Sequence, residues 1–217
     1  MHAAGNGWNH NTHYHERLLQ ALPLSCDRAL DVGCGRGAFT RRLAAMAQHV
    51  DAIDRDAVTI EQARRESAAH PNVTFIESDF MSWPAPATYD VVAMIATLHH
   101  LPFEPALAKA DTLLRPGGTL IVLGLNRDPF LLGAMHAAVA YPVSWGHRIT
   151  RKSAAVGAPI REPDMTLPDI RRRAGAMLPG AQIQRHLLWR YSLRWSKPNH
   201  GDETSRPQPG TFRRTLR

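Results

Sequence analysis

The chain has 217 residues, a formal net charge of +7 and two cysteines. This length can bury one substantial hydrophobic core, so we expect a single domain. Cys26 and Cys34 are too few for a disulfide framework and have no C-x-x-C partner, which argues against a disulfide-rich fold or a zinc motif. The polar N-terminus has no signal-peptide core and no apolar run reaches the roughly 18 residues of a membrane span, so we expect a cytoplasmic protein with no membrane partner.

The positive charge is concentrated in the last third of the chain. Residues 1–145 carry 11 Lys and Arg against 14 Asp and Glu, whereas residues 146–217 carry 15 against 5. A nucleic-acid site needs basic groups on one face with aromatic residues between them. Arg190, Tyr191, Arg194 and Trp195 come closest to that pattern. We interpret the excess mainly as a solvated basic face and tail, and do not expect a nucleic-acid partner.

Predicted strands and helices alternate along the first 125 residues, which is typical of a mostly parallel sheet covered by helices. Hydrophobic spacing predicts helices over 10–21, 37–47, 56–69 and 104–114, and strands over 28–33, 49–54, 73–77, 89–96 and 118–124. Pro116, Gly117 and Gly118 predict that the last of these helices ends at Arg115 and that the chain then turns into its strand.

The pattern is looser after residue 126. We expect an apolar helix over 130–145, forming core or a lid, an irregular loop over 151–168 and a helix over 169–178. Two short alternating segments within 181–197 suit an antiparallel strand pair. The residues from 198 onward are rich in Pro, Gly and Arg and are predicted to be disordered.

Three glycines join the first predicted strand to the helix after it. The buried run over 29–32 leads directly into Gly33, Gly35 and Gly37. Glycine permits positive φ and lets a ligand approach the backbone closely. The free N–H groups of a helix start then point toward that ligand. This junction predicts a cofactor site.

Polar residues follow the next strands in turn. Asp54 ends the second predicted strand, where a parallel neighbour places an acid that can accept hydrogen bonds from ribose hydroxyls. Asp79 and Phe80 follow the third strand, and an acceptor beside an aromatic ring suits an adenine. The fourth strand runs into His99 and His100. All of these ends meet at one edge of a parallel sheet, where ligands of such folds bind.

Together these segments resemble the class I S-adenosylmethionine-dependent methyltransferases. Residues 30–37 are similar to the first motif of that family, and the other segments follow in the family's order, namely Asp54, Asp79-Phe80, 89–92, 98–101 and 114–118. Residues 8–15 resemble the start of small bacterial members. The resemblance implies an α/β, Rossmann-like fold with a mostly parallel seven-stranded sheet that ends in an antiparallel pair. It also implies S-adenosylmethionine as cofactor and S-adenosylhomocysteine as product.

The resemblance implies roles for particular residues. Asp31 would fix the glycine loop and the amino group of the cofactor, Asp54 would hold the ribose, and Asp79 would accept from the adenine amine. Phe80 or Arg55 would border the adenine ring. The full set of implied cofactor-binding residues is Asp31, Gly33, Cys34, Gly35, Gly37, Asp54, Arg55, Asp79, Phe80, Ile95 and Ala96.

Methyl transfer requires an aligned acceptor and the exclusion of water, and a general base helps when the acceptor is a hydroxyl, a phenol or a protonated amine. Histidine has a suitable pKa. His99, His100 and His15 are the candidates, with a structural or wall role as the alternative. His10, His13 and His15 would lie on two faces of a helix with no accompanying carboxylates, so we expect no metal.

Three other functions compete with this one. A nicotinamide-dependent oxidoreductase is disfavoured, because Gly37 comes one residue early for G-x-G-x-x-G and no Tyr-x-x-x-Lys follows. A non-catalytic scaffold that keeps the cofactor pocket stays open, as does an RNA methyltransferase that uses the basic C-terminal region.

The acceptor is expected to be a small molecule that receives the methyl group on oxygen or nitrogen. The regions that would select it carry an apolar and aromatic set that lines a pocket or belongs to the core, comprising Trp8, Tyr14, Phe130, Met135, Tyr141, Trp145 and Met165. We expect one methyltransferase domain over 1–198, with an N-terminal cap region (1–26), a cofactor-binding core (27–125) and a lid or substrate region (126–168). A basic tail follows over 199–217, and the protein is expected to be a monomer or homodimer.

Overall fold

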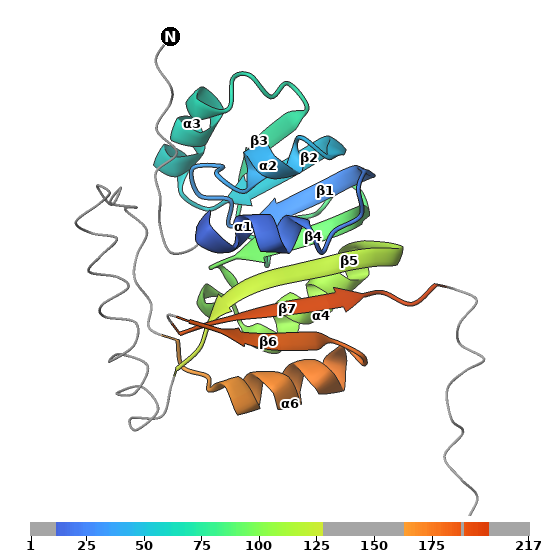
Figure 1. Ribbon diagram of the computed structural model, residues 1–217. Helices are drawn as coiled ribbons and strands as arrows, with labels where there is room; N and C mark the ends of the chain where they lie inside the picture. The colour runs from blue at the N-terminus through green and yellow to red at the C-terminus, as the bar shows by residue number, and fades with distance from the viewer. Residues whose placement is uncertain (1–11, 128–162, 188, 200–217) are drawn as a thin grey trace, which may run out of the picture.

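A computed structural model describes residues 12–127, 163–187 and 189–199, with the side chains of Thr12 and His13 left out. Its centre is a seven-stranded sheet in the order β3-β2-β1-β4-β5-β7-β6 (Figure 1). The strands are β1 (Cys26–Val32), β2 (Ala47–Asp54), β3 (Val73–Glu77), β4 (Tyr89–Ile95), β5 (Leu114–Leu125), β6 (Gln182–His186) and β7 (Arg190–Ser196).

The strand directions confirm the predicted fold class. The first five strands pair in parallel, whereas β7 is antiparallel to both β5 and β6. The chain builds outward from β1 to β3 on one side, and then β4 pairs with the other side of β1. This reversal of the strand order lies between β1 and β4, where a parallel sheet opens a crevice at the carboxyl ends of its strands.

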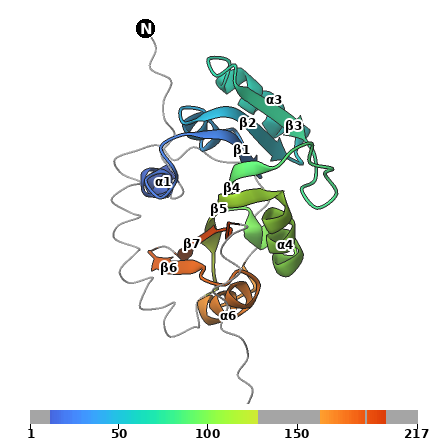
Figure 2. The same cartoon turned by 90° about the vertical axis from the view of Figure 1, so that its right-hand side faces the viewer.

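Helices cover both faces of the sheet (Figure 2). They are α1 (Thr12–Leu19), α2 (Thr40–Leu43), α3 (Ala57–Glu66), α4 (Phe103–Leu113) and α6 (Leu167–Met177), with a short 3₁₀ turn η1 (Leu98–His100) after β4. Successive strand residues point to opposite faces. Accordingly Val91 packs in a cluster with Tyr14 of α1, and its neighbour Val92 packs in the cluster that contains Leu107 of α4 and Ile170 of α6.

The helix predicted over 37–47 is much shorter than expected. Only Thr40–Leu43 is α-helical, and turns flank it on both sides. The amide of Met46 bonds to the carbonyl of Leu43, and the carbonyl of Met46 accepts the amide of Cys26. Ala47 then pairs with Cys26, so β2 begins at Ala47 and not at residue 49. The prediction was wrong because Met46 and Ala47, which the helical spacing had included, pair with β1 instead.

The predicted stop signal after α4 is also wrong in its details. The helix ends at Leu113, and β5 begins at Leu114 and continues through Pro116, Gly117 and Gly118. Leu114 pairs with Tyr89, and Thr119 pairs with Val91, so residues 115–118 stand opposite Asp90 as a bulge. Proline and glycine are tolerated within a strand at such an irregularity. The breaker residues therefore bend a strand that has already begun.

The remaining boundaries differ by a few residues. The helix α6 begins at Leu167 with Pro168 in its first turn, because the hydroxyl of Thr166 accepts the amide of Asp169 as a cap; Pro168 had been expected in a loop. The antiparallel pair within 181–197 is confirmed as β6 and β7. The helix expected over 130–145, most of the loop over 151–168 and the tail from residue 200 lie outside the described residues. Among the helices of the described ranges, none is long and apolar enough to cross a membrane.

Candidate functional site

The glycine loop after β1 is built from left-handed backbone. Gly33, Gly35 and Gly37 have φ of 68°, 53° and 74°. A Cβ on Gly33 would lie 2.3 Å from the hydroxyl of Thr97, whereas a Cβ on Gly35 would meet nothing within 4 Å. The first glycine is therefore required for packing against the end of β4. Gly35 borders open space, where a ligand can approach the backbone.

Asp54 ties the glycine loop to the end of β2. Its Oδ2 accepts the amide of Gly35 at 3.0 Å, and its Oδ1 accepts the amide of Asp56 at 3.1 Å. The side chain is only half-buried. Because a carboxylate oxygen has two lone pairs, both oxygens can still accept a hydrogen bond from a ligand. The position at the strand end agrees with the sequence expectation.

Asp31 is fully buried beneath the same loop. Its Oδ2 accepts the hydroxyl of Thr40 at 2.6 Å, while Oδ1 has no hydrogen-bond partner within the described residues. Burial raises the pKa of Asp31 to about 7, the Thr40 hydrogen bond opposes this, and the charge of Asp54 adds to it. A buried carboxylate oxygen without a partner fits a ligand that brings a donor or a positive charge.

Thr40 is a residue of the candidate site that sequence reasoning missed. It is buried at the start of α2 and orients Asp31 by donating its hydroxyl proton. The available signal was a polar residue three positions before Leu43, at the spacing of the apolar side of a segment expected to be an amphipathic helix. Thr97 was missed as well, and it donates to the carbonyl of Gly33 at 3.3 Å from beyond β4.

The residues expected to contact the adenine differ in their exposure to solvent. Asp79 is exposed, and its Oδ1 accepts the amide of Met81 at 2.7 Å. Phe80 is only 4% exposed and belongs to the main core cluster, so its ring does not face a ligand there. Arg55, the other residue expected beside the ring, is exposed after β2. The sequence could not separate these two, since an aromatic residue after a strand suits either a core or a ligand wall.

The end of β4 carries unusual backbone. Ala96 has φ of 56°, which is uncommon for a residue with a side chain, and its amide bonds to the carbonyl of Leu123 at 2.6 Å. Ile95 and Ala96 are half-buried at this rim. His99 and His100 follow in η1 with their ring centres 4.0 Å apart, and both are half-buried. The structure thus brings these four expected residues to the same sheet edge as the glycine loop.

His15 and Cys34 have environments that limit their chemistry. His15 is buried edge-on against the ring of Phe39 at 5.0 Å, and burial, with a smaller contribution from Arg42, lowers its pKa to about 4. A base with so low a pKa is weak near neutral pH. Burial raises the pKa of Cys34 above the usual thiol range, so its part in the loop is that of a packed apolar side chain.

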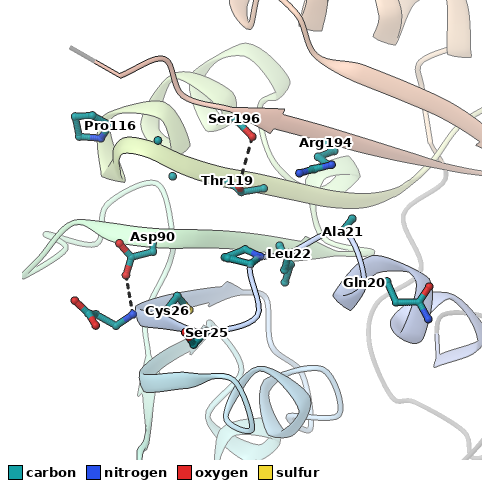
Figure 3. Close-up of a pocket in the computed structure, with 14 residues that line it drawn as sticks. Gln20, Ala21, Leu22, Ser25, Cys26, Asp90, Pro116, Thr119, Arg194 and Ser196 are labelled. Carbon is teal, nitrogen blue, oxygen red and sulfur yellow. Dashed lines mark hydrogen bonds between the residues drawn. The ribbon is translucent and has the colours of Figure 1, made fainter. Parts of the chain in front are cut away.

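A separate cavity of about 640 Å³ lies at the opposite edge of the sheet (Figure 3). The connection from α1 to β1, the start of β4, the β5 bulge and β7 form its walls, which include Asp90, Thr119 and Arg194. Asp90 there accepts the amides of Asp27 and Arg28 and is bonded to Arg115. None of the residues predicted for the cofactor or for catalysis lines this cavity.

Sequence comparison identifies related proteins over nearly the whole chain. Residues 29–118 match a family model described as a methyltransferase domain. An uncharacterized methyltransferase of Mycobacterium tuberculosis strain H37Rv is 34% identical over 194 residues, which cover 88% of this chain and 98% of the relative. A ubiquinone biosynthesis O-methyltransferase of Xylella fastidiosa is 37% identical over 126 residues, covering 55% of this chain and 51% of the relative.

Solved structures show the same fold. The N-methyltransferase NodS from Bradyrhizobium japonicum in complex with S-adenosylhomocysteine aligns with a TM-score of 0.61 at 19% identity, covering 90% of this chain and 94% of NodS. A DhpI complex with S-adenosylmethionine aligns with a TM-score of 0.61 at 20% identity and covers 84% of each chain. These comparisons and the glycine loop agree: the chain belongs to the methyltransferase-domain family and is a class I S-adenosylmethionine-dependent methyltransferase.

Proposed function

We propose that the protein methylates an oxygen or nitrogen atom of a small organic acceptor that binds at the carboxyl edge of β4 and β5. The observation that carries this proposal is the character of that edge after β4, where residues 95–101 carry no lysine or arginine. Ile95 is half-buried there and packs against a buried apolar cluster that includes Phe39 and Leu123. A segment without basic side chains suits a small apolar body more than a polyanion. The names of the relatives, which include O- and N-methyltransferases, point the same way.

We assign the cofactor to the glycine loop and the strand ends around it. Asp31, with its unpartnered buried oxygen, would hold the amino group, and Asp54 would hold the ribose hydroxyls. Asp79 would accept from the adenine amine. The backbone at Gly35 leaves space for the methionine part. Because Phe80 is buried in the core, Arg55 takes the place beside the adenine ring.

When bound, S-adenosylmethionine supplies an electrophilic methyl group on a sulfonium. The chain's own contribution is to align the acceptor atom and to exclude water. Ile95 and Ala96 would form the wall near the reacting atoms. His99 would take the proton from an acceptor hydroxyl or ammonium, and the ring of His100 lies beside it at a tilt of 40°. His15 is less suited to that role because it is buried and its pKa is low.

RNA as the acceptor is the alternative that the basic C-terminal region suggests. Base recognition by this region would need aromatic rings between its arginines. Tyr191 and Trp195 are only 2% and 5% exposed and pack in the core, whereas Arg194 is exposed on the other face of β7. The strand therefore separates the two kinds of side chain that a nucleic-acid surface combines, which favours a small acceptor.

Methyl transfer from labelled S-adenosylmethionine tests the proposal. The protein is incubated with a panel of small phenols, alcohols, amines and carboxylic acids, and in parallel with total transfer and ribosomal RNA. We expect label in one class of small acceptor and none in RNA. Label in RNA alone, with tight and salt-sensitive RNA binding, would contradict the proposed acceptor class.

A further inference from the structure

Lys109 of α4 holds the turn that follows β3, and we define this turn as residues 79–83. Its Nζ donates to the carbonyl of Met81 at 3.1 Å and to the carbonyl of Trp83 at 2.6 Å. It also lies 5.2 Å from the ring centre of Phe80. One ammonium group therefore contacts three residues of the turn from a helix that follows it in the chain.

The turn is also held in place by the burial of two of its aromatic side chains. Phe80 and Trp83 are buried in the main core cluster, which also contains Leu107 of α4. Burial lowers the pKa of Lys109, while the negative charge of Asp79 acts in the opposite direction. A partly desolvated ammonium is retained at such a place when carbonyls and a nearby carboxylate compensate the lost water.

The hydrogen bonds of Lys109 are connected to Asp79 through Met81 and Trp83. The amide of Met81 donates to Oδ1 of Asp79 at 2.7 Å, and the carbonyl of Met81 accepts from Lys109. The carbonyl of Asp79 accepts the amide of Trp83 at 2.9 Å, and the carbonyl of Trp83 is the second acceptor of Lys109. Met81 and Trp83, which both bind Asp79, are thus bound by Lys109, and the hydroxyl of Ser82 adds a longer hydrogen bond to the carbonyl of Asp79 at 3.4 Å.

We propose that Lys109 is a positioning residue that sets the direction of the Asp79 carboxylate and so the preference for an adenine base. The inference rests on the proposed assignment of Asp79 to the adenine amine. A carboxylate oxygen can accept a hydrogen bond from that amine. A deaminated base carries a carbonyl oxygen there, which is also an acceptor and cannot donate to the carboxylate. A site whose acceptor is held in place to receive a hydrogen bond from the ligand rejects a ligand that lacks the donor.

The test compares two ligands on the full-length protein by isothermal titration, namely S-adenosylhomocysteine and its deaminated analogue S-inosylhomocysteine. We expect the wild-type protein to prefer the adenine ligand by about tenfold or more, as a lost charge-assisted hydrogen bond predicts. Lys109→Met keeps the length of the side chain and removes its donors. It should lower that ratio at least about threefold, and Lys109→Arg should restore most of it.

Lys197→Met is the matched control. Its Nζ donates to the carbonyl of Asp111 at 2.7 Å, so it binds the same helix but not the turn. This variant should keep the wild-type ratio even if its melting temperature falls. Should Lys109→Met fail to fold, Lys109→Gln retains a donor and should give an intermediate ratio.

The outcomes separate the inference from the assignments beneath it. A wild-type ratio in folded Lys109→Met, or in Lys109→Gln, overturns the role of Lys109. Equal binding of the two ligands by the wild-type protein contradicts the assignment of Asp79, and the inference falls with it. No binding of either ligand by the wild-type protein contradicts the cofactor site itself.

Discussion

Two carboxylates at the proposed cofactor site differ because their surroundings differ. Asp54 is half-buried, and both of its oxygens accept backbone amides. Asp31 is fully buried and has one bonded and one unpartnered oxygen. Both oxygens of Asp54 therefore have partners within the protein, whereas the unpartnered oxygen of Asp31 can accept a hydrogen bond from a ligand.

Asp54→Ala should weaken the binding of S-adenosylhomocysteine by about 1 to 3 kcal/mol, because it removes the acceptor proposed for the ribose and frees the amide of Gly35. Isothermal titration measures this loss. Asp56→Ala is the control, since that exposed side chain caps α3 by accepting from Thr59. Equal affinity in wild-type and Asp54→Ala proteins would remove Asp54 from the site.

Gly35→Val should abolish cofactor binding and leave a folded protein, because the added side chain enters the open space beside the loop. The left-handed φ of 53° adds about 1 to 2 kcal/mol of strain. Titration measures binding, and circular dichroism checks the fold. Gly175→Ala in α6 also adds a Cβ into open space and should bind normally. Retained binding by Gly35→Val would mean that the loop does not contact the cofactor.

The protonation of Asp31 should make the stability of the ligand-free protein depend on pH. Because burial raises its pKa from 3.8 to about 7, the protonated form stabilises the fold. This contribution is fully present below pH 3.8 and is lost as the pH rises through about 7. The loss is on the order of 4 kcal/mol, because each unit of pKa difference corresponds to about 1.4 kcal/mol.

Urea denaturation of the wild-type protein and of Asp31→Asn across pH 4 to about 8 checks this dependence. The asparagine carries no charge, so the difference between the two free energies of unfolding isolates the carboxyl group. The wild-type protein should lose stability relative to the variant as the pH rises. A difference that stays constant across this range would show that Asp31 does not titrate there.

At the scale of the elements, the β5 bulge is held by one side chain of β4. Asp90 Oδ2 accepts the amides of Asp27 and Arg28, each at 2.9 Å, and Oδ1 accepts from Arg115 at 3.0 Å. It therefore connects the start of β1, its own strand and the bulge. These contacts lie at the amino edge of the sheet, away from the cofactor site.

Asp90→Ala should destabilise the fold by about 2 to 4 kcal/mol, because it leaves two amides and a half-buried guanidinium without their acceptor. Chemical denaturation measures the free energy of unfolding. Asp27→Ala is the control, because its exposed carboxylate contacts Arg115 only at 3.7 Å and should contribute little. Affinity for S-adenosylhomocysteine should be unchanged in both variants. Equal stability of the two variants would contradict this role of Asp90.

At the scale of the whole molecule, ligand binding and folding are coupled. S-adenosylhomocysteine at about 100 times its dissociation constant should stabilise the protein by about 2.7 kcal/mol and raise its melting temperature. NAD at the same concentration should have no effect, since Gly37 is placed one residue too early for a dinucleotide loop. Differential scanning fluorimetry measures both. An upward shift with NAD would reopen the oxidoreductase function.

The sequence alone predicted the parts of the site that depend on local chemistry. Gly33, Gly35 and Gly37 were expected to have positive φ, and all three do. The alternation of strands and helices predicted the parallel sheet, and the short alternating segments near the end predicted β6 and β7. These features follow from spacing and from backbone preferences that each residue carries with it.

The tertiary structure decided what depends on partners distant in the chain. It buried Phe80 in the core, left one oxygen of Asp31 without a partner, and shortened the helix after the glycine loop because Ala47 pairs with Cys26. It also brought Lys109 to the turn that carries Asp79. Burial and pairing arise only when separate segments pack together, so no local pattern could have predicted them.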